Sequence, residues 1–327
     1  MLRWIVSFLT AGAIAMGFVR SIPPTPTPTP VPYVEMTIPY LRARTYSSRL
    51  GALQKTGENA SYTSYRASYD SDGLTIYGLL TIPKDARAKH PAIVFVHGYI
   101  PPKQYRTDER YVAYVDYLAR NGFVVFKIDL RGNDQSQGTA SGAYYSSGYV
   151  IDTLNARAAL SVSDFVTPNA IGLWGHSMAG NVVMRAFAAR PQIPAVAIWA
   201  GAGYTYTDLL TYGLHDTSYR AAGIPDPHAL PQSVRSYYGA FNASNPFWKQ
   251  VAVTDYLKDL KGAIEIHHAV DDDVVPIEYS RNLMKLLDQT SVPHQLFEYP
   301  TGGHNITDPS FSTAMSRTVA FFKQYLH

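Results

Sequence analysis

Short, mostly apolar runs recur along the chain and predict buried strands. A strand that is covered on both faces is apolar at most positions, whereas a half-exposed strand alternates between apolar and polar residues. Strands of the first kind are expected at residues 92–96, 123–130, 170–174, 195–199 and 263–267. Such strands are typical of parallel sheets that carry helices on both sides.

The segments between these runs show the periodicity of helices. In residues 110–120 the apolar residues share one face, and Asn121-Gly122 supplies a stop signal. A second amphipathic helix is expected after Pro276. A third is expected near the C-terminus, with Asp308 as its N-cap and Pro309 at the first helical position.

An antiparallel hairpin is expected at the start of the sheet. Residues 62–83 have the pattern of two strands joined through Asp70-Ser71-Asp72-Gly73, and the second, 74–82, is rich in β-branched and aromatic residues. Strands that alternate with helices after such a start predict an α/β protein with a mostly parallel, doubly wound sheet. Function in these sheets lies at the carboxyl ends of the strands.

Residues 1–20 have the character of an export signal. Arg3 precedes the apolar run 4–19, which is shorter than the roughly 20 residues of a spanning helix but long enough for the core of a secretory signal. The sequence is compatible with cleavage and with retention as a membrane anchor. Residues 21–35 are rich in proline and threonine and predict a stiff linker, which leaves 36–327 for the folded domain. The protein is therefore expected outside the cytoplasmic membrane.

Composition narrows the chemistry. The chain has 327 residues, only 16% of them charged, and its net charge is +3. Without a basic stripe, nucleic acid is not an expected partner. The absence of cysteine excludes disulfides, thiolate nucleophiles and cysteine-zinc sites. No cofactor is expected, and covalent catalysis would need a nucleophile other than cysteine.

Ser177 is the candidate nucleophile. The predicted strand 170–174 runs into Gly175-His176-Ser177-Met178-Ala179-Gly180, and a helical pattern begins at Asn181. A serine at a strand-to-helix turn projects its hydroxyl over the edge of the sheet, while the helix N-terminus presents free N–H groups to a developing oxyanion. The plain alternative is a turn serine without a catalytic role.

A nucleophilic serine needs a histidine to take its proton and a carboxylate to hold that histidine. His304 is the candidate base, because it follows a strand pattern at 295–299 and a glycine-containing turn. The acid is expected after the strand 263–267, where three aspartates stand in a row at positions 271–273, and spacing alone does not choose among them. A metal site built from these aspartates and His267-His268 is disfavoured, because neighbouring residues on a strand point to opposite faces.

Three segments together resemble the catalytic motifs of α/β-hydrolase-fold serine hydrolases. They are the stretch around Ser177, the stretch from His268 to Pro276, and Gly303-His304. The likeness is to the catalytic domain of the prolyl oligopeptidase family and its esterase-like relatives, over residues 62–327. The family pattern His-Gly-x-x-Asp-x-x-Val-Pro, laid on His268, implies Asp272 as the acid, although Ala269 replaces the usual glycine. The propeller domain of that family is not present in this sequence.

The resemblance also implies an oxyanion hole. His97-Gly98 matches the turn at the oxyanion strand, and Asp129–Gly132 matches a further loop of the family. In this fold one donor is the backbone N–H of the residue after the nucleophile, here Met178, and the other comes from the turn, here Tyr99.

A long insertion is expected to form a lid. Residues 204–256 contain ten aromatic residues and follow the strand 195–199, whose carboxyl end lies at the catalytic edge. We expect this lid to carry the acyl or leaving-group pocket. The alternative use of its aromatic residues is a small hydrophobic core for the insertion itself.

These features predict a serine hydrolase that cleaves a carboxylic ester or a short peptide or amide bond through an acyl-enzyme. Ser177 would attack, His304 would move the proton, and Asp272 would orient His304. The expected partner is a small ester or peptide substrate. The alternative is a non-catalytic binding protein on the same fold.

Overall fold

The computed structural model describes residues 31–141, 143–215 and 230–327. The export signal expected at 1–20 and most of the linker expected at 21–35 lie outside these residues. The described part belongs almost entirely to one structural unit, residues 33–327. Within the described ranges, no helix combines the length and the apolar character needed to cross a bilayer.

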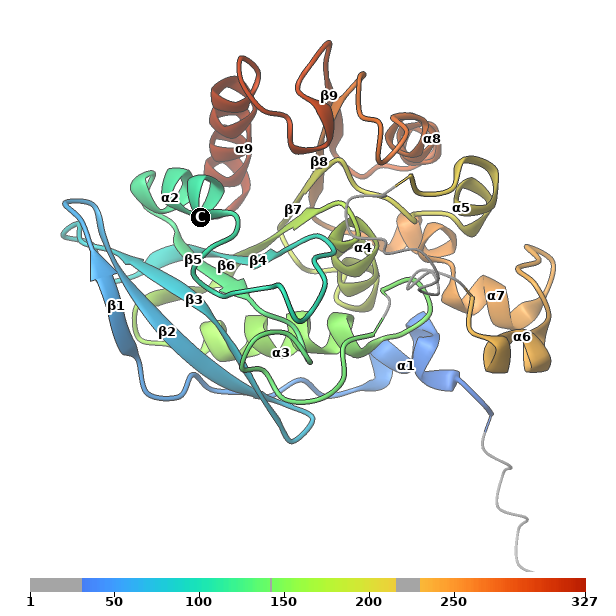
Figure 1. The fold of residues 1–327 in the computed structure, drawn as a ribbon, viewed down its shortest axis with the longest axis horizontal. Helices are drawn as coiled ribbons and strands as arrows, with labels where there is room; N and C mark the ends of the chain where they lie inside the picture. The colour runs from blue at the N-terminus through green and yellow to red at the C-terminus, as the bar shows by residue number, and fades with distance from the viewer. Residues whose placement is uncertain (1–30, 142, 216–229) are drawn as a thin grey trace, which may run out of the picture. The chain divides into compact units, whose positions relative to one another are not determined.

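A nine-stranded sheet runs through this unit in the order β1-β2-β3-β5-β4-β6-β7-β8-β9 (Figure 1). The strands are β1 (Gln54–Glu58), β2 (Tyr62–Ser71), β3 (Leu74–Pro83), β4 (His90–Val96), β5 (Val124–Ile128), β6 (Val166–His176), β7 (Ala195–Trp199), β8 (Ala263–Ala269) and β9 (His294–Tyr299). Pairing is antiparallel from β1 to β3 and between β3 and β5. It is parallel from β5 through β4, β6, β7 and β8 to β9. The mostly parallel, doubly wound sheet with an antiparallel start is confirmed.

Helices cover both faces of the sheet (Figure 1). They are α1 (Ile38–Ala43), α2 (Val112–Arg120), α3 (Gly148–Ser161), α4 (Ala179–Ala189), α5 (Tyr206–Tyr212), α6 (Gln232–Tyr238), α7 (Pro246–Val251), α8 (Glu278–Leu287) and α9 (Phe311–Tyr325), with 3-10 turns η1 (Val34–Met36), η2 (Val253–Asp259) and η3 (Gly303–Asn305). One face carries α3 and α4, which pack against each other, and the other carries α2 and α9.

The core lies on both sides of the sheet, which explains why these runs are mostly apolar. Along β4, Val94 and Val96 belong to one hydrophobic cluster, while Ile93 and Phe95 belong to the cluster on the opposite face. Because successive side chains of a strand point to opposite faces, a strand between two cores has few positions for a polar residue, and those that occur, such as Lys127 in β5, are themselves buried.

β2 and β3 form the predicted hairpin. Ser71 pairs with Leu74, so that Asp72 and Gly73 make the turn. Their φ angles are 56° and 75°, in the left-handed region that aspartate and glycine tolerate better than other residues.

The last helix begins later than the sequence predicted. Its N-cap is Ser310 and its first residue is Phe311, so the prediction of Asp308 as the cap and Pro309 at the first position was wrong. The N–H of Ser310 donates to the carbonyl of Thr307 at 3.1 Å, which closes a separate turn before the helix starts.

The insertion at 204–256 packs its rings on one another. Tyr206 stacks on Phe241 with 5.3 Å between ring centroids, and Trp248 meets both rings. Tyr238 stacks on Phe247 at 3.6 Å. Within the described residues, the aromatic residues therefore build a hydrophobic core for the insertion, which was the alternative expectation.

Candidate active site

Ser177 lies on a sharp turn between β6 and α4. Its φ angle is 55°, a left-handed conformation that a non-glycine residue rarely adopts. The turn is held from both sides, because the N–H of Ser177 donates to the carbonyl of Trp199 at 2.9 Å and its carbonyl accepts from Gly180 at 2.8 Å. A Cβ at Gly175 would lie 2.9 Å from the carbonyl oxygen of Ala179. The small residues of the motif are therefore required by the close approach of strand and helix.

His304 sits in η3, directly after a glycine-containing loop that follows β9. The backbone at Gly302 and Gly303 has φ angles of 134° and 57°, which glycine adopts without strain. Both N–H groups donate to the carboxylate of Asp271, at 3.3 and 2.8 Å. Asp271 thus holds the loop that precedes His304 in place through two hydrogen bonds.

Among the three consecutive aspartates, Asp272 is the one that contacts the histidine. Its Oδ2 atom accepts from Nδ1 of His304 at 2.8 Å. Its Oδ1 atom accepts the backbone N–H groups of Val274 and Val275, both at 2.9 Å. His268 approaches Oδ2 through Nε2 at 3.2 Å.

The charge of Asp272 is stabilised by these contacts. Burial by itself would raise the pKa of Asp272, but the hydrogen bonds from His268 and His304 outweigh it and hold the pKa well below its ordinary value. The carboxylate is therefore ionised and accepts the Nδ1 proton of His304. That tautomer leaves Nε2 of His304 unprotonated and able to take a proton.

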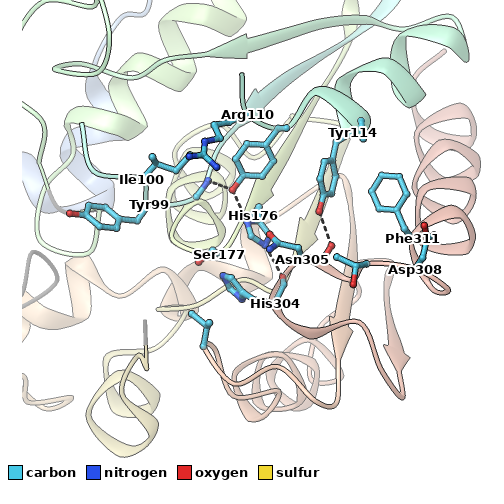
Figure 2. Close-up of a pocket in the computed structure, with 15 residues that line it drawn as sticks. Tyr99, Ile100, Arg110, Tyr114, His176, Ser177, His304, Asn305, Asp308 and Phe311 are labelled. Carbon is cyan, nitrogen blue, oxygen red and sulfur yellow. Dashed lines mark hydrogen bonds between the residues drawn. The ribbon is translucent and has the colours of Figure 1, made fainter. Parts of the chain in front are cut away.

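Ser177 and His304 face the same cavity, which has a volume of about 460 Å³ (Figure 2). The structure shows no hydrogen bond between these two side chains, a common situation in enzymes without bound substrate. The rest of the wall is largely aromatic and apolar, with two charged side chains. It comprises Gly98, Tyr99, Ile100, Arg110, Tyr111, Ala113, Tyr114, His176, Val274, Asn305, Thr307, Asp308 and Phe311.

Both residues expected to supply the oxyanion donors lie near Ser177. Met178 is the N-cap of α4, where the first backbone N–H groups have no partner within the helix. Tyr99 lies in the turn after β4 and lines the cavity. This turn packs closely against Ser177, because a Cβ at Gly98 would lie 3.1 Å from the Cβ of Ser177.

A chain of hydrogen bonds links this turn to the loop of His304. The N–H of Gly98 donates to Oη of Tyr111 at 3.0 Å, and Tyr111 is 2.7 Å from Nδ1 of His176. Nε2 of His176 lies 2.9 Å from the carbonyl oxygen of His304 (Figure 2). A carbonyl can only accept, so Nε2 of His176 carries the proton and Nδ1 accepts from the tyrosine hydroxyl.

Burial keeps His176 in this neutral form. It lowers the pKa of His176 to about 3, far below the ordinary value of 6.5. From the sequence, neither His176 nor Tyr111 was assigned a functional role. No local signal could identify the pair, because 65 positions separate the two residues in the chain.

The expectation that the insertion carries the substrate pocket is not met by its described residues. None of residues 204–215 and 230–256 lines the cavity at Ser177. Apart from His176, Ser177 and Val274, the wall comes from segments 98–114 and 304–311, on the side of α2 and α9. The part of the insertion at 216–229 lies outside the described residues.

The loop Asp129–Gly132 and the pair His267-His268, which also stood out in the sequence, make contacts within the folded domain. Arg131, in the loop Asp129–Gly132, forms a paired contact with the buried carboxylate of Asp152, at 3.0 and 2.7 Å. His267 contacts Glu265 at 2.7 Å, whereas His268 contacts Ser280 at 2.7 Å. Across the described ranges, no group of three or more His, Asp or Glu residues is arranged to hold a metal ion.

A sequence model described as the prolyl oligopeptidase family matches residues 110–327, two thirds of the chain. The chain belongs to the prolyl oligopeptidase family. A second model, described as acetyl xylan esterase, matches residues 52–160. The family makes this protein a serine hydrolase, either an esterase or a peptidase. The alternative of a non-catalytic binding protein is therefore set aside.

Solved structures with the same fold include both kinds of enzyme. Acetyl xylan esterase 1 from Thermoanaerobacterium sp. JW/SL YS485 is 18% identical, with a TM-score of 0.60 over 88% of this chain and 92% of that one. Est1E from Butyrivibrio proteoclasticus, with ferulic acid bound, is 22% identical, with a TM-score of 0.57 over 78% and 97%. The acylaminoacyl peptidase of Pyrococcus horikoshii is 20% identical, with a TM-score of 0.63 over 81% of this chain but only 42% of its own. These likenesses show the α/β-hydrolase fold.

Proposed function

We propose that Ser177, His304 and Asp272 form the catalytic triad of this hydrolase. The observation that carries the assignment is the 2.8 Å hydrogen bond from Nδ1 of His304 to Asp272, beside the cavity that also holds Ser177. The left-handed backbone of Ser177 supports its role, because strained conformations of this kind cluster at active sites.

The reaction follows from the positions of these groups. Oγ of Ser177 attacks the carbonyl carbon of the substrate while Nε2 of His304 takes the hydroxyl proton. The negative charge on the carbonyl oxygen is stabilised by the backbone N–H groups of Met178 and Tyr99. His304 then protonates the leaving alcohol or amine, and the acyl group stays on Ser177. A water molecule then attacks the acyl carbon while His304 takes its proton, and His304 returns that proton to Oγ of Ser177 as the carboxylic acid leaves.

We further propose that Tyr111 and His176 are positioning residues of this site. Their hydrogen bonds connect Gly98, beside the oxyanion donor, to the backbone of His304. The connection keeps the donor turn and the base at a fixed separation while charge develops between them. Preorganisation of this kind avoids the cost of reorienting groups in the transition state.

We infer that carboxylic esters are the preferred substrates. The match spans 92% and 97% of the two esterase structures but only 42% of the acylaminoacyl peptidase. The cavity wall includes Tyr111, Tyr114 and Phe311, which suits an apolar or aromatic group next to the scissile bond. A peptide or amide bond is the second candidate, supported by the family match over residues 110–327.

A panel of chromogenic substrates tests both parts of the proposal. Purified protein and its Ser177→Ala variant would be compared on p-nitrophenyl esters of increasing acyl length and on aminoacyl p-nitroanilides. We expect turnover of esters by the parent only, and a fluorophosphonate probe should label Ser177. Faster turnover of the anilides would reverse the preference, whereas full activity of Ser177→Ala or labelling of another serine would refute the triad.

We also propose that the enzyme works outside the cytoplasmic membrane. Support comes from Arg3, the apolar run 4–19 and the proline-rich linker, which together have the features of an export signal and a spacer. Cell fractionation followed by N-terminal sequencing would show whether residues 1–20 are removed or stay as a membrane tether. A cytoplasmic protein that retains Met1–Arg20 would refute export.

A further inference from the structure

Arg110 brings a positive charge into the wall of the cavity that contains Ser177. Its side chain is exposed, so a molecule in the cavity can reach the guanidinium group. In Figure 2, Arg110 lies near Ile100, on the side of the turn that carries the proposed oxyanion donor. Because most of the wall is aromatic and apolar, this charge is not part of a general polar surface.

The guanidinium group of Arg110 has no hydrogen-bond or ion-pair partner within the described residues. The two acidic residues that precede it in the chain do not neutralise it. Asp108 pairs with Arg66 at 2.6 Å, and Glu109 makes no ion pair with Arg110 in the described ranges. A guanidinium group carries five N–H donors, all of which are therefore available to a ligand.

The backbone of Arg110, in contrast, is held in place. Its carbonyl oxygen accepts a hydrogen bond of 2.7 Å from Nζ of Lys127, which is fully buried. The next residue, Tyr111, is fixed through its hydroxyl group, which is bonded to Gly98 and His176. A group on a fixed segment loses less conformational entropy when a ligand binds to it. Arg110 therefore presents free donors from a rigid part of the wall.

The place of Arg110 in the fold does not explain its charge. It directly precedes Tyr111, the N-cap of α2, and the first turn of α2 has no acidic residue. Because a helix N-terminus carries partial positive charge, a cation there does not stabilise the helix. Asp308, the other charged residue of the wall, lies two residues before Ser310, the N-cap of α9, where a negative charge is favourable. The carboxylate thus has a structural explanation that the guanidinium group lacks.

The arrangement of the wall suits a substrate with one negative charge. Arg110 and Asp308 form no ion pair with each other within the described residues, and Tyr114 and Phe311 lie between them in the view of Figure 2. A guanidinium group binds a carboxylate or a phosphate through two parallel hydrogen bonds. One arginine on a mostly apolar wall matches the single charge of a carboxylate, whereas a phosphate dianion would need further donors.

We propose that the substrate of this hydrolase is an ester that carries a free carboxylate group, and that Arg110 binds this group. The proposal rests on the proposed active site at Ser177. The carboxylate accepts two hydrogen bonds from the guanidinium group, while the apolar part of the substrate lies against the aromatic wall. Arg110 determines specificity in this way and takes no part in the proton transfers.

Two pairs of substrates measure this specificity on the full chain. 4-Acetoxybenzoate and 4-acetoxybenzamide differ in charge on the alcohol side of the ester, and the mono-p-nitrophenyl esters of adipic and adipamic acid differ on the acyl side. For the carboxylate member of at least one pair, Arg110→Gln should lower kcat/KM at least about 5-fold, mainly through KM. The amide members should change less than about 2-fold. Equal effects on both members of each pair would overturn the proposal.

Two further variants separate the role of Arg110 from that of charge in general. Arg110→Lys keeps the charge but not the paired hydrogen bonds, so it should retain part of the carboxylate preference. Arg49→Gln removes an equal charge from an exposed residue outside the cavity and should leave the preference unchanged. If Arg49→Gln reduced the preference as much as Arg110→Gln, the effect would come from the net charge of the protein, and the proposal would be wrong.

Binding can also be measured apart from catalysis. Calorimetry on Ser177→Ala gives the Kd of the carboxylate ester that shows the larger preference, and Arg110→Gln in the same background should raise this Kd at least about 5-fold. An unchanged Kd would overturn the role of Arg110 even where the triad is correct. Hydrolysis of the ester by Ser177→Ala would instead refute the triad, and the comparison of the parent with Arg110→Gln would still test the carboxylate preference.

Discussion

Nε2 of His176 donates a hydrogen bond of 2.9 Å to the backbone carbonyl of His304. The residue next to the nucleophile thus supports the backbone of the base, across 128 positions of sequence. Tyr111 extends this support to Gly98, whose N–H donates to the tyrosine hydroxyl. The loops that carry the proposed nucleophile, oxyanion donor and base are therefore joined by one line of hydrogen bonds.

Removing the Tyr111 hydroxyl should abolish its hydrogen bonds to Gly98 and His176 and leave its aromatic ring in place. For Tyr111→Phe we expect kcat on an activated ester to fall about 10-fold, less than the loss of about 10²–10³ that follows removal of a direct oxyanion donor. KM should change less than about 2-fold, because the affected contacts act in the transition state. Tyr117→Phe is the control, since Tyr117 lies on α2 but does not line the cavity. A rise in KM alone, or equal kcat values in the two variants, would contradict the positioning role.

The acid of the triad can be separated from its two neighbours by single substitutions. Asp272→Asn should lower kcat by about 10³ or more, because it removes the charge that holds the Nδ1 proton of His304. Asp273→Asn should retain nearly full activity, because Asp273 is exposed and has no contact with His304. Steady-state kinetics on one ester, with circular dichroism as a check of folding, make the comparison. Full activity of Asp272→Asn would remove it from the triad.

Substitution of Asp271 should lower kcat less than substitution of Asp272 and more than substitution of Asp273. The reason is that Asp271 acts on His304 only through the loop that it holds in place. Asp271→Ala removes the acceptor of the Gly302 and Gly303 N–H groups. We expect kcat to fall about 3- to 30-fold, because small displacements of a catalytic group are costly in rate. Asp271→Asn keeps one acceptor oxygen and should recover part of the activity. If both variants match the parent enzyme, the loop does not need this carboxylate.

Gly98 leaves no room for a side chain. A Cβ there would lie 2.9 Å from Oη of Tyr111 and 3.1 Å from both Nδ1 of His176 and Cβ of Ser177. Gly98→Ala should therefore displace the oxyanion turn and lower kcat by about 10²-fold, comparable to the loss of an oxyanion donor. Gly57→Ala is the control, because a Cβ at Gly57 meets nothing within 4 Å. Normal turnover in Gly98→Ala would show that the turn can move without cost.

Stability should depend on pH through two buried histidines. Burial lowers the pKa of His176 to about 3 and that of His97 to about 4, from an ordinary value of 6.5. Below pH 6.5 the unfolded chain binds protons at these residues that the folded protein does not bind. The free energy of unfolding should therefore decrease as the pH falls from about 6.5 to about 4, by about 1.4 kcal/mol per pH unit for each histidine.

Urea unfolding across this pH range, for the parent and His176→Gln, measures the effect. The variant has one buried histidine fewer and should show a shallower dependence on pH. Parallel curves for the two proteins would mean that His176 does not titrate as its burial requires.

Local sequence patterns were sufficient to predict the strands that are covered on both faces and the helices that bury one face. β4 and β7 are apolar at almost every position because both faces are covered, and α2 keeps one apolar face. The prediction omitted α3, because most residues of Gly148–Ser161 are buried and the helix therefore has no distinct polar face. Periodicity identifies a helix only where one side of it meets solvent.

Short-range preferences of the backbone were enough to predict the strand-to-helix turn at Ser177 and the glycine loop before His304, and the alternation of apolar runs with helical patterns was enough to predict the mostly parallel sheet. Only the folded structure shows which of the three adjacent aspartates meets His304, since their side chains differ in direction and not in type. It also joined Tyr111 to His176 and placed the cavity wall on segments 98–114 and 304–311 instead of the described part of the insertion. Contacts between residues far apart in the chain depend on how helices and strands pack, and no local pattern of polar and apolar residues specifies that packing.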